Sequence, residues 1–483
     1  MTLPTAAPRT APTAAVPHPR RWLALVLLLT AEAMNLLDST IVQVAAPVMH
    51  SGLAGPAADI QWFSAAYTLP FAVLLVTGGR LGDIAGRRRV FRIGVAGFLL
   101  ASLCCALAPT AGLLIAARAV QGGAAALVIP QTFGLIKAMF DGDELSRALG
   151  TIGPVMGLAA VCGPVLGGVL THADLFGSSW RAVFLVNLPL GVAVLAASPL
   201  MREDRAEHRP RLDLAGTVLL VFGSVLLVAP LIEVDAIANA AVAGAVVAGL
   251  AVLLLFGLHQ RGKTRRGRSP LVETSLFANR GFPAALATST LFFAVMNGLM
   301  LVVVLQVQLT RHAGVLTAGL TLLPWSCGMA VASLCAGTWL VPRFGSRVMF
   351  AGLVVMADGV AGAAVDYAVA SAGSGSWPLL AALAVGGAGI GLFTVPFFTA
   401  ALHRVRPQET GSAAGLLNAV QQLGGTLGVA LLGTVFLRAG AADGAWTACC
   451  VAAGLLAATA LTARMMSPTD AAAVGAAPAG TGG

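Results

Sequence analysis

The stretch that decides the fold is WLALVLLLTAEAMNLLDSTIVQVAA, at residues 22–46, which carries only two charged side chains, Glu32 and Asp38. One helical crossing of a bilayer needs about 20 mostly apolar residues. The run is too long for the apolar region of a signal peptide, and many runs of similar length follow it. It therefore predicts a membrane-spanning helix with two carboxylates inside the hydrocarbon.

The rest of the chain repeats this pattern. Of 483 residues, 58% are hydrophobic and 10% are charged, whereas soluble proteins carry about 25% charged residues. This composition excludes a soluble enzyme, a disordered chain and a coiled coil, and it predicts an all-α polytopic membrane protein of the cell membrane. We count fourteen apolar runs: 22–46, 60–80, 90–108, 111–133, 147–170, 181–201, 214–232, 236–258, 281–308, 313–340, 347–368, 377–402, 410–437 and 443–464.

The basic residues follow membrane topology. With fourteen spans and a cytoplasmic start, 25 of the 29 Lys and Arg residues fall in cytoplasmic segments. Cytoplasmic loops are rich in Lys and Arg, so this distribution supports an even number of spans with both termini inside. The net charge of +9 therefore reflects topology, and no nucleic-acid partner is expected.

Two loops reveal an internal repeat. LGDIAGRR at 81–88 and LVPRFGSR at 340–347 share Leu, then Gly five positions on, then Arg two further on. Each loop joins the second and third helices of a six-helix half. We expect a disordered tail at 1–21, a six-helix half at 22–201, two inserted helices with a basic linker at 202–280, a second half at 281–464 and a disordered tail at 465–483, both tails being cytoplasmic.

Several motifs follow in order. They are LDSTIVQVAAP at 37–47, RAVQGG at 118–123, the Gly and Pro residues between 153 and 168, WRAVFLVNLP at 180–189 and the glycine-rich segment 411–428. With these motifs the chain resembles the major facilitator superfamily, and most closely its fourteen-span drug:proton antiporters. Two positions depart from the pattern: Pro342 stands where the first repeat has Asp83, and Gln421 stands where many relatives have arginine.

Three ionisable residues are candidates for proton coupling. Charges in hydrocarbon are costly and mark functional sites, and helical rise places Glu32 near the midplane and Asp38 at the depth of Arg118. Glu32, Asn35, Asp38, Ser39 and Gln43 fall on one arc of the first helix, which we expect to face a wet cavity. A stripe sealed between helices, or a permanent Asp38–Arg118 ion pair, is the alternative. The resemblance also implies a proton-transfer role for Arg118.

The resemblance further implies two conformational motifs. A gating loop would contain Gly82, Asp83, Gly86, Arg87 and Arg88. An antiporter motif in the fifth span would form a pliable contact between the halves, with the glycines of the thirteenth span as its partner and simple close packing as the alternative. Its residues would be Gly153, Pro154, Gly157, Gly163, Pro164, Gly167 and Gly168.

Candidate substrate ligands are aromatic and amide side chains within the spans, each of which could equally be core or lipid-facing. They are Asn35, Gln43, Gln121, Phe293, Asn297, Trp325, Phe397, Asn418 and Gln422. Asp358 also lies near the midplane, either in the cavity or against a neighbouring helix.

These features predict a proton-driven efflux antiporter that exports a small lipophilic drug or antibiotic, which could also be cationic. The alternatives are a dedicated exporter of a self-made metabolite such as an antibiotic, a siderophore or an amino acid, a nutrient symporter, and a membrane sensor that transports nothing. No phosphate-binding loop is present, so no nucleotide is expected. We expect no enzymatic activity, no cofactor, no metal and a monomer whose partners are its substrate, protons and the lipid bilayer.

Overall fold

The computed structural model describes residues 20–466, except 175–176, 206–211, 234–237, 279, 370–376, 404 and 407–408. The expected tails at 1–21 and 465–483 therefore lie almost entirely outside the described residues. Within the described part the chain is helical without strands, and fourteen helical segments are long and apolar enough to cross a membrane. The prediction of an all-α protein with fourteen spans is confirmed.

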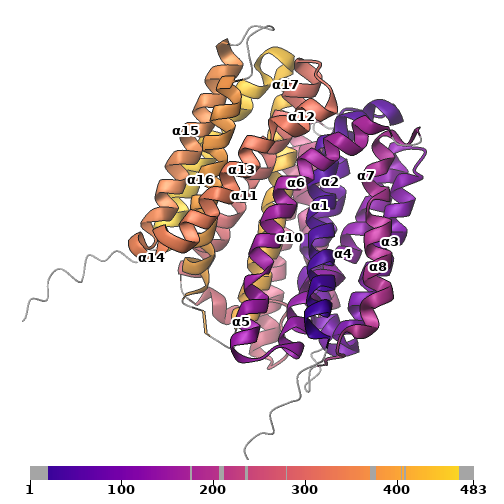
Figure 1. Cartoon of the computed structure of the whole chain (residues 1–483). Helices are drawn as coiled ribbons and strands as arrows, with labels where there is room; N and C mark the ends of the chain where they lie inside the picture. Colours follow the sequence, from indigo (N-terminus) through magenta and orange to yellow (C-terminus); the bar gives the residue numbers. More distant parts are fainter. Residues whose placement is uncertain are drawn as a thin grey trace, which may run out of the picture.

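The first part of the chain forms an N-terminal bundle (Figure 1). Its elements are α1 (Arg21–Leu53), α2 (Ala58–Ala85), α3 (Arg87–Ala106), α4 (Ala111–Met139), α5 (Gly142–Gly150), α6 (Ile152–Ala173), η2 (Ser179–Arg181), α7 (Ala182–Leu185), α8 (Asn187–Ala197) and η3 (Ser198–Leu200). The helices run beyond the apolar stretches, because helical hydrogen bonding continues into the polar boundary of a bilayer. Thus α1 has 33 residues, or about 50 Å at 1.5 Å per residue.

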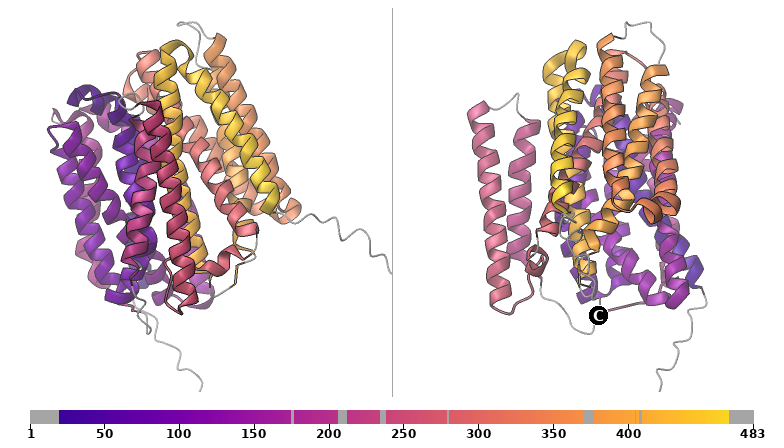
Figure 2. Two further views of the ribbon diagram at one scale, coloured as in Figure 1. Left: turned by 180° about the vertical axis from the view of Figure 1, so that it is seen from behind. Right: turned by 90° about the vertical axis from the view of Figure 1, so that its left-hand side faces the viewer.

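Two helices, α9 (Leu214–Ile232) and α10 (Asn239–Arg265), form a hairpin at one side of the molecule (Figure 2). The hairpin is tied together where α9 begins. Asp213 accepts hydrogen bonds from the backbone N–H of Gly216 and the side chain of Gln260, and it pairs with Lys263 at 2.8 Å. Most of the surface of α10 is exposed, so it faces lipid.

The last part of the chain forms a C-terminal bundle. Its elements are η4 (Thr274–Phe277), α11 (Gly281–Leu305), η5 (Gln306–Thr310), α12 (Val315–Thr321), α13 (Leu323–Cys335), η6 (Ala336–Leu340), α14 (Val341–Phe344), α15 (Arg347–Val369), α16 (Trp377–Leu402) and α17 (Thr410–Met466). The long α17 contains two spans, Ser412–Gly440 and Asp443–Met466. They meet at Gly440, whose φ of 78° interrupts the helix.

Glycines allow the helices to approach closely at equivalent places in the two bundles. A Cβ added at Gly122 of α4 would lie 2.0 Å from the carbonyl oxygen of Tyr67 in α2. A Cβ at Gly387 of α16 would likewise lie 2.0 Å from the carbonyl oxygen of Trp325 in α13. Only residues without side chains permit such backbone contact. The two contacts therefore bring α4 against the backbone of Tyr67 and α16 against the backbone of Trp325.

The two bundles meet differently at their two ends. We call the end where α1 begins and α2 ends the basic end, because Arg21 and Arg80 lie there, and the other end the opposite end. Near the opposite end Gln308 donates a hydrogen bond of 2.8 Å to the carbonyl oxygen of Val44. In Figure 1, α5 and α14 lie apart at the basic end, while α6 and α12 lie together toward the opposite end.

Candidate functional site

A cavity of about 660 Å³ lies between the two bundles. Its walls come from α1, α2, α4, α6, α11, α13, α16 and α17. This volume is typical of sites for drug-sized ligands. Among the described residues that line it, Glu32 is the only ionisable one.

One face of α1 supplies the polar wall of the cavity. Glu32, Asn35, Ser39 and Gln43 all line it, as their spacing along a helix requires. Glu32 is 6% exposed as a residue, and its Oε2 atom is buried without a hydrogen-bond partner among the described residues. Glu32 is therefore an acidic residue in the wall of the cavity, with one carboxylate oxygen unsatisfied.

Asp38 does not share that face, and the expectation that it faces the cavity is wrong. It is 0% exposed and is not among the residues lining the cavity. A helix turns 100° per residue, so Asp38 points toward α4 and α8 while its neighbour Ser39 points into the cavity. The arc that seemed to be one polar stripe is divided between two environments.

Asp38 is instead the centre of a buried polar network. Its Oδ2 atom pairs with Nη1 of Arg118, and its Oδ1 atom accepts hydrogen bonds from Gln121 at 2.9 Å and Asn187 at 2.7 Å. Gln121 also donates to Ser102 at 2.8 Å and accepts from Arg118 at 2.7 Å. The structure thus brings together the acid and the arginine whose depths matched in the sequence.

Two aromatic side chains and one backbone oxygen hold Arg118 in place. Its Nε atom donates to the carbonyl oxygen of Phe63 at 3.0 Å. Its guanidinium lies 4.3 Å from the ring centre of Tyr67 and 5.8 Å from that of Phe184. A second guanidinium nitrogen, Nη2, has no hydrogen-bond partner in the structure. Loss of the Asp38 charge therefore leaves a buried cation that must find new partners.

The C-terminal bundle contributes the aromatic and amide side chains opposite Glu32. Four predicted ligands from this bundle line the cavity: Asn297, Trp325, Asn418 and Gln422. The C-terminal bundle also contributes Met296, Met300, Met329, Phe398 and Gln421. The N-terminal bundle adds Ser64, Thr68, Phe71, Phe133 and Met156. The cavity therefore combines flexible thioether and aromatic surface with several amide hydrogen-bonding groups.

Three predicted ligands lie outside the cavity. Gln121 belongs to the Asp38 network. Phe293 and Phe397 are buried in an aromatic cluster, in which the ring centres of Phe397 and Phe393 are 5.2 Å apart. Phe398 lines the cavity in place of Phe397, because adjacent residues on a helix point 100° apart.

Asp358 also lies outside the cavity. It is exposed on α15 and does not line the space between the bundles. The structure therefore removes it from the candidate substrate ligands.

The predicted antiporter motif lies at the contact between the bundles. A Cβ at Gly168 would lie 3.0 Å from Cα of Leu316, and one at Gly319 would lie 2.5 Å from the carbonyl oxygen of Pro164. The other motif glycines do not reach across: Gly163 and Gly167 pack on α1, Gly153 lines the cavity and nothing lies near Gly157.

The expectation that the glycines of the thirteenth span are the partner of this motif is wrong. The glycines of the thirteenth span pack on α11 of their own bundle, where a Cβ at Gly428 would lie 1.9 Å from the carbonyl oxygen of Ala294. The motif instead meets α12.

The predicted gating loop is almost entirely helical. Helix α2 continues to Ala85 and α3 begins at Arg87, so only Gly86, with φ of 101°, lies between them. Arg87 pairs with Asp83 at 2.9 Å and with Asp204 at 3.2 Å. Arg88 donates its backbone N–H to Glu203 at 3.1 Å. These contacts tie the α2–α3 junction to the segment after α8, within the N-terminal bundle.

Sequence reasoning missed Asn187, Ser102 and Tyr67 as members of the buried network. Asn187 stands in the motif at 180–189, but a single amide gave no reason to place it beside Asp38. The described residues contain no group of three or more His, Cys, Asp and Glu side chains that could hold a metal ion.

Comparisons with known proteins agree with this architecture. The family model of the Major Facilitator Superfamily matches residues 28–429. The chain is 43% identical over 422 residues to the "Probable actinorhodin transporter" of Streptomyces coelicolor, covering 87% of this chain and 73% of that protein. It is 35% identical to a puromycin resistance protein of Streptomyces alboniger, covering 88% and 84% of the two chains.

A solved structure of a POT family transporter in complex with 5-aminolevulinic acid has the same fold. Its TM-score is 0.66 at 11% identity, and the match covers 92% of this chain and 96% of that one. The two bundles, the cavity between them and the family match together lead to one conclusion. The chain is a multi-pass membrane protein that belongs to the major facilitator superfamily, and its fourteen spans are those of the drug:proton antiporter branch.

Proposed function

We propose that this protein exports a drug-sized lipophilic compound across the cell membrane in exchange for protons. The observation that carries the proposal is the cavity between the bundles. Among the described residues that line it, Glu32 is the only ionisable one and stands among aromatic, thioether and amide side chains. Flexible Met and aromatic side chains suit varied lipophilic ligands. A carboxylate in such a site can bind either a proton or a cationic or hydrogen-bonding group of the cargo.

We place the basic end of the molecule in the cytoplasm, with both termini on that side. The arginines at the junctions of α2 with α3 and of α8 with the following segment support this orientation, because cytoplasmic loops are enriched in Lys and Arg. The bundles contact one another toward the opposite end through Gly168 and Gln308. The structure then corresponds to a form in which the cavity is reached from the cytoplasm, where an exporter collects its cargo.

Proton coupling follows from two acids in different environments. Glu32 lies in the cavity, where cargo and proton compete for the carboxylate. Asp38 is sealed beside Arg118, with which it pairs, and it also accepts hydrogen bonds from Gln121 and Asn187. Protonation of Asp38 releases Arg118, and the new partners that Arg118 takes change how α1, α4 and α8 pack. We propose that this change accompanies alternating access, in which the two bundles rock about the central cavity.

For the cargo we propose an antibiotic, with a compound made by the producing cell as the more specific form of the proposal. The 43% identity to a protein named as an actinorhodin transporter favours this form. We propose a monomer as the working unit. Neither nucleotide nor metal has a part in this scheme, and the protein acts as a carrier without catalysing a reaction.

The proposal is tested in a host that lacks its own drug pumps. Cells expressing the wild-type protein are loaded with puromycin or with actinorhodin, and the retained compound is measured with and without an uncoupler. Export driven by protons predicts low retention that rises to the level of empty-vector cells when the uncoupler is added. Retention of both compounds equal to that of vector cells before the uncoupler, or unchanged by it, would contradict the proposal.

A further inference from the structure

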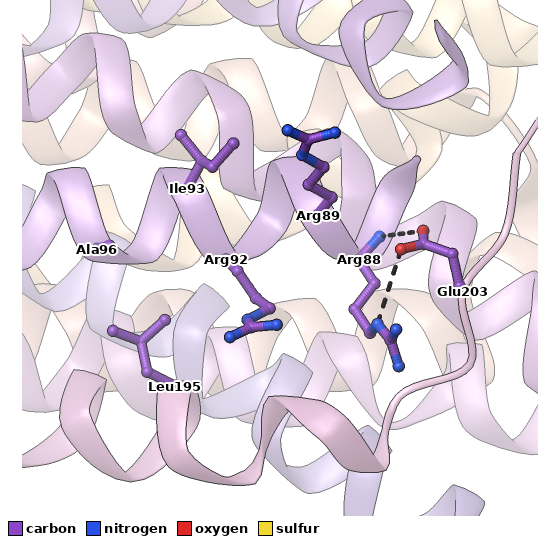
Figure 3. Close-up of a pocket in the computed structure, with 7 residues that line it drawn as sticks. All are labelled: Arg88, Arg89, Arg92, Ile93, Ala96, Leu195 and Glu203. Carbon is purple, nitrogen blue, oxygen red and sulfur yellow. Dashed lines mark hydrogen bonds and ion pairs between the residues drawn. The ribbon is translucent and has the colours of Figure 1, made fainter. Parts of the chain in front are cut away.

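A second recess lies outside the transport cavity, at the basic end of α3. It is a groove of about 690 Å³ between the first turns of α3, the end of α8 and the segment that follows α8 (Figure 3). Its walls are Arg88, Arg89, Arg92, Ile93, Ala96, Leu195 and Glu203. None of these residues lines the cavity between the bundles.

The groove carries more positive charge than its own acid can neutralise. Glu203 is committed to Arg88, accepting the backbone N–H at 3.1 Å and pairing with Nε at 3.7 Å. Arg88 also donates to the carbonyl oxygen of Met201 at 3.1 Å. Arg89 and Arg92 are exposed, and neither side chain has an ion pair or a hydrogen bond with the described residues (Figure 3). Two guanidinium groups therefore remain available for an anion.

The other half of the groove is apolar. Ile93 is 54% exposed, and Ala96 and Leu195 continue the same wall. Seven residues separate Arg89 from Ala96, which is about 10 Å along a helix. Since α3 crosses the membrane from this end, the arginines lie at the level of the headgroups and the apolar wall lies at the level of the acyl chains. A basic rim above an apolar floor is complementary to an amphiphile with a phosphate head.

We propose that this groove binds an anionic phospholipid of the cytoplasmic leaflet. Its phosphate contacts Arg89 and Arg92, and one acyl chain lies along Ile93, Ala96 and Leu195. A free phosphate or a soluble phosphate ester would use the arginines but not the apolar floor, so the floor favours a lipid as the occupant. The proposal does not depend on transport, because the groove is separate from the cavity.

The bound lipid would also contact the junction of α2 and α3. Its headgroup would lie beside the Arg88–Glu203 pair, and next to it Arg87 is paired with Asp204. These pairs join α3 to the segment after α8. The lipid is therefore expected to stabilise the N-terminal bundle as well as to occupy its surface.

The test uses the purified full-length protein in detergent. Binding of phosphatidylglycerol is measured by native mass spectrometry, and its effect on the melting temperature is compared with those of phosphatidylcholine and glycerol 3-phosphate. Near a membrane surface each basic residue contributes about 1 kcal/mol to binding of anionic lipid. The R89Q/R92Q variant should therefore bind phosphatidylglycerol about 30-fold more weakly than the wild type.

Two further variants separate this site from general electrostatic attraction. R266Q/R268Q removes two exposed arginines from the linker after α10 and should bind phosphatidylglycerol as the wild type does. Ala96→Trp fills the apolar floor without changing charge and should weaken lipid binding while leaving the arginines intact. Equal losses in R89Q/R92Q and R266Q/R268Q, unchanged binding in R89Q/R92Q, or stabilisation by glycerol 3-phosphate equal to that by the lipid would each overturn the proposal.

Discussion

Replacing Asp38 by asparagine should destabilise the protein strongly, because it leaves Arg118 as a buried cation without its counter-charge. Both side chains are at most 1% exposed. An asparagine can still accept the hydrogen bonds from Gln121 and Asn187 through its oxygen, but its NH₂ group would then face the guanidinium, donor against donor. Breaking a buried ion pair from one side costs about 3–5 kcal/mol, and we expect a loss of that size.

The double variant D38N/R118M decides whether the pair itself is responsible. Methionine removes the buried cation and keeps an unbranched side chain of similar length, so the asparagine no longer meets an unpaired charge. We expect the double variant to be at least ~2 kcal/mol more stable than the sum of the single losses predicts, since residues in one network couple by up to about 3 kcal/mol. The free energy of unfolding is measured by SDS titration in mixed micelles.

A pair near the surface provides the control. Asp83 and Arg87 are also bonded at 2.9 Å, but their side chains are 30% and 25% exposed. Solvent screening limits such pairs to about 1 kcal/mol or less, so D83N should change stability far less than D38N. Losses from D38N and R118M that simply add, to within 0.5 kcal/mol, would refute the idea that the two residues form one energetic unit.

Two other predictions follow from contacts elsewhere in the molecule. Gly168→Val should drive the bundles apart at the opposite end, because the first added carbon already lies 3.0 Å from Cα of Leu316. Proteoliposomes that contain this variant are expected to leak protons without cargo. Nothing lies near Gly157, so the control variant Gly157→Val should cause no such leak. Asp213→Asn should lower the melting temperature at pH 7 by loosening the α9–α10 hairpin, which Lys263 holds at 2.8 Å.

The pH dependence of the Asp213 contribution has a definite sign. Burial alone would raise the pKa of Asp213, but the hydrogen bonds from Lys263, Gly216, Gln260 and His259 together hold this pKa below its ordinary value. Its stabilisation is therefore complete above the ordinary value of about 3.9 and is lost only as the pH falls further toward the folded-state pKa. The difference in melting temperature between wild type and Asp213→Asn should persist from pH 8 to pH 5, and a difference that disappears within that range would contradict this reasoning.

Proton leak that is equal in Gly157→Val and Gly168→Val would contradict the role given to the α6–α12 contact.

The sequence predicted the number of spans and the pairing of Asp38 with Arg118, and each success has a physical reason. Apolar runs of about 20 residues have few alternatives to a membrane helix. Helical rise converts sequence position into depth, so an acid and a base at equal depth could be matched before their contact was seen.

What the sequence could not provide was the direction in which each side chain points. Most spans are apolar around their whole circumference, so no polar stripe fixes their rotation, and for this reason Phe397 was chosen instead of Phe398. The first span does carry a polar arc, but this arc faces two environments, and Asp38 was therefore placed in the cavity instead of against α4. The partner of Gly168 was misplaced for a related reason, because a small residue permits a close contact without indicating which helix will make it.

The number of protons released when cargo binds tests the central claim most directly. Purified protein in weakly buffered detergent solution is mixed with puromycin, and proton release and drug binding are recorded together. The account predicts that the wild type and Asp358→Asn, which alters an acid outside the cavity, both release protons on binding. Glu32→Gln should still bind the drug but release none. Proton release per bound drug that is the same in Glu32→Gln as in the wild type would contradict the account.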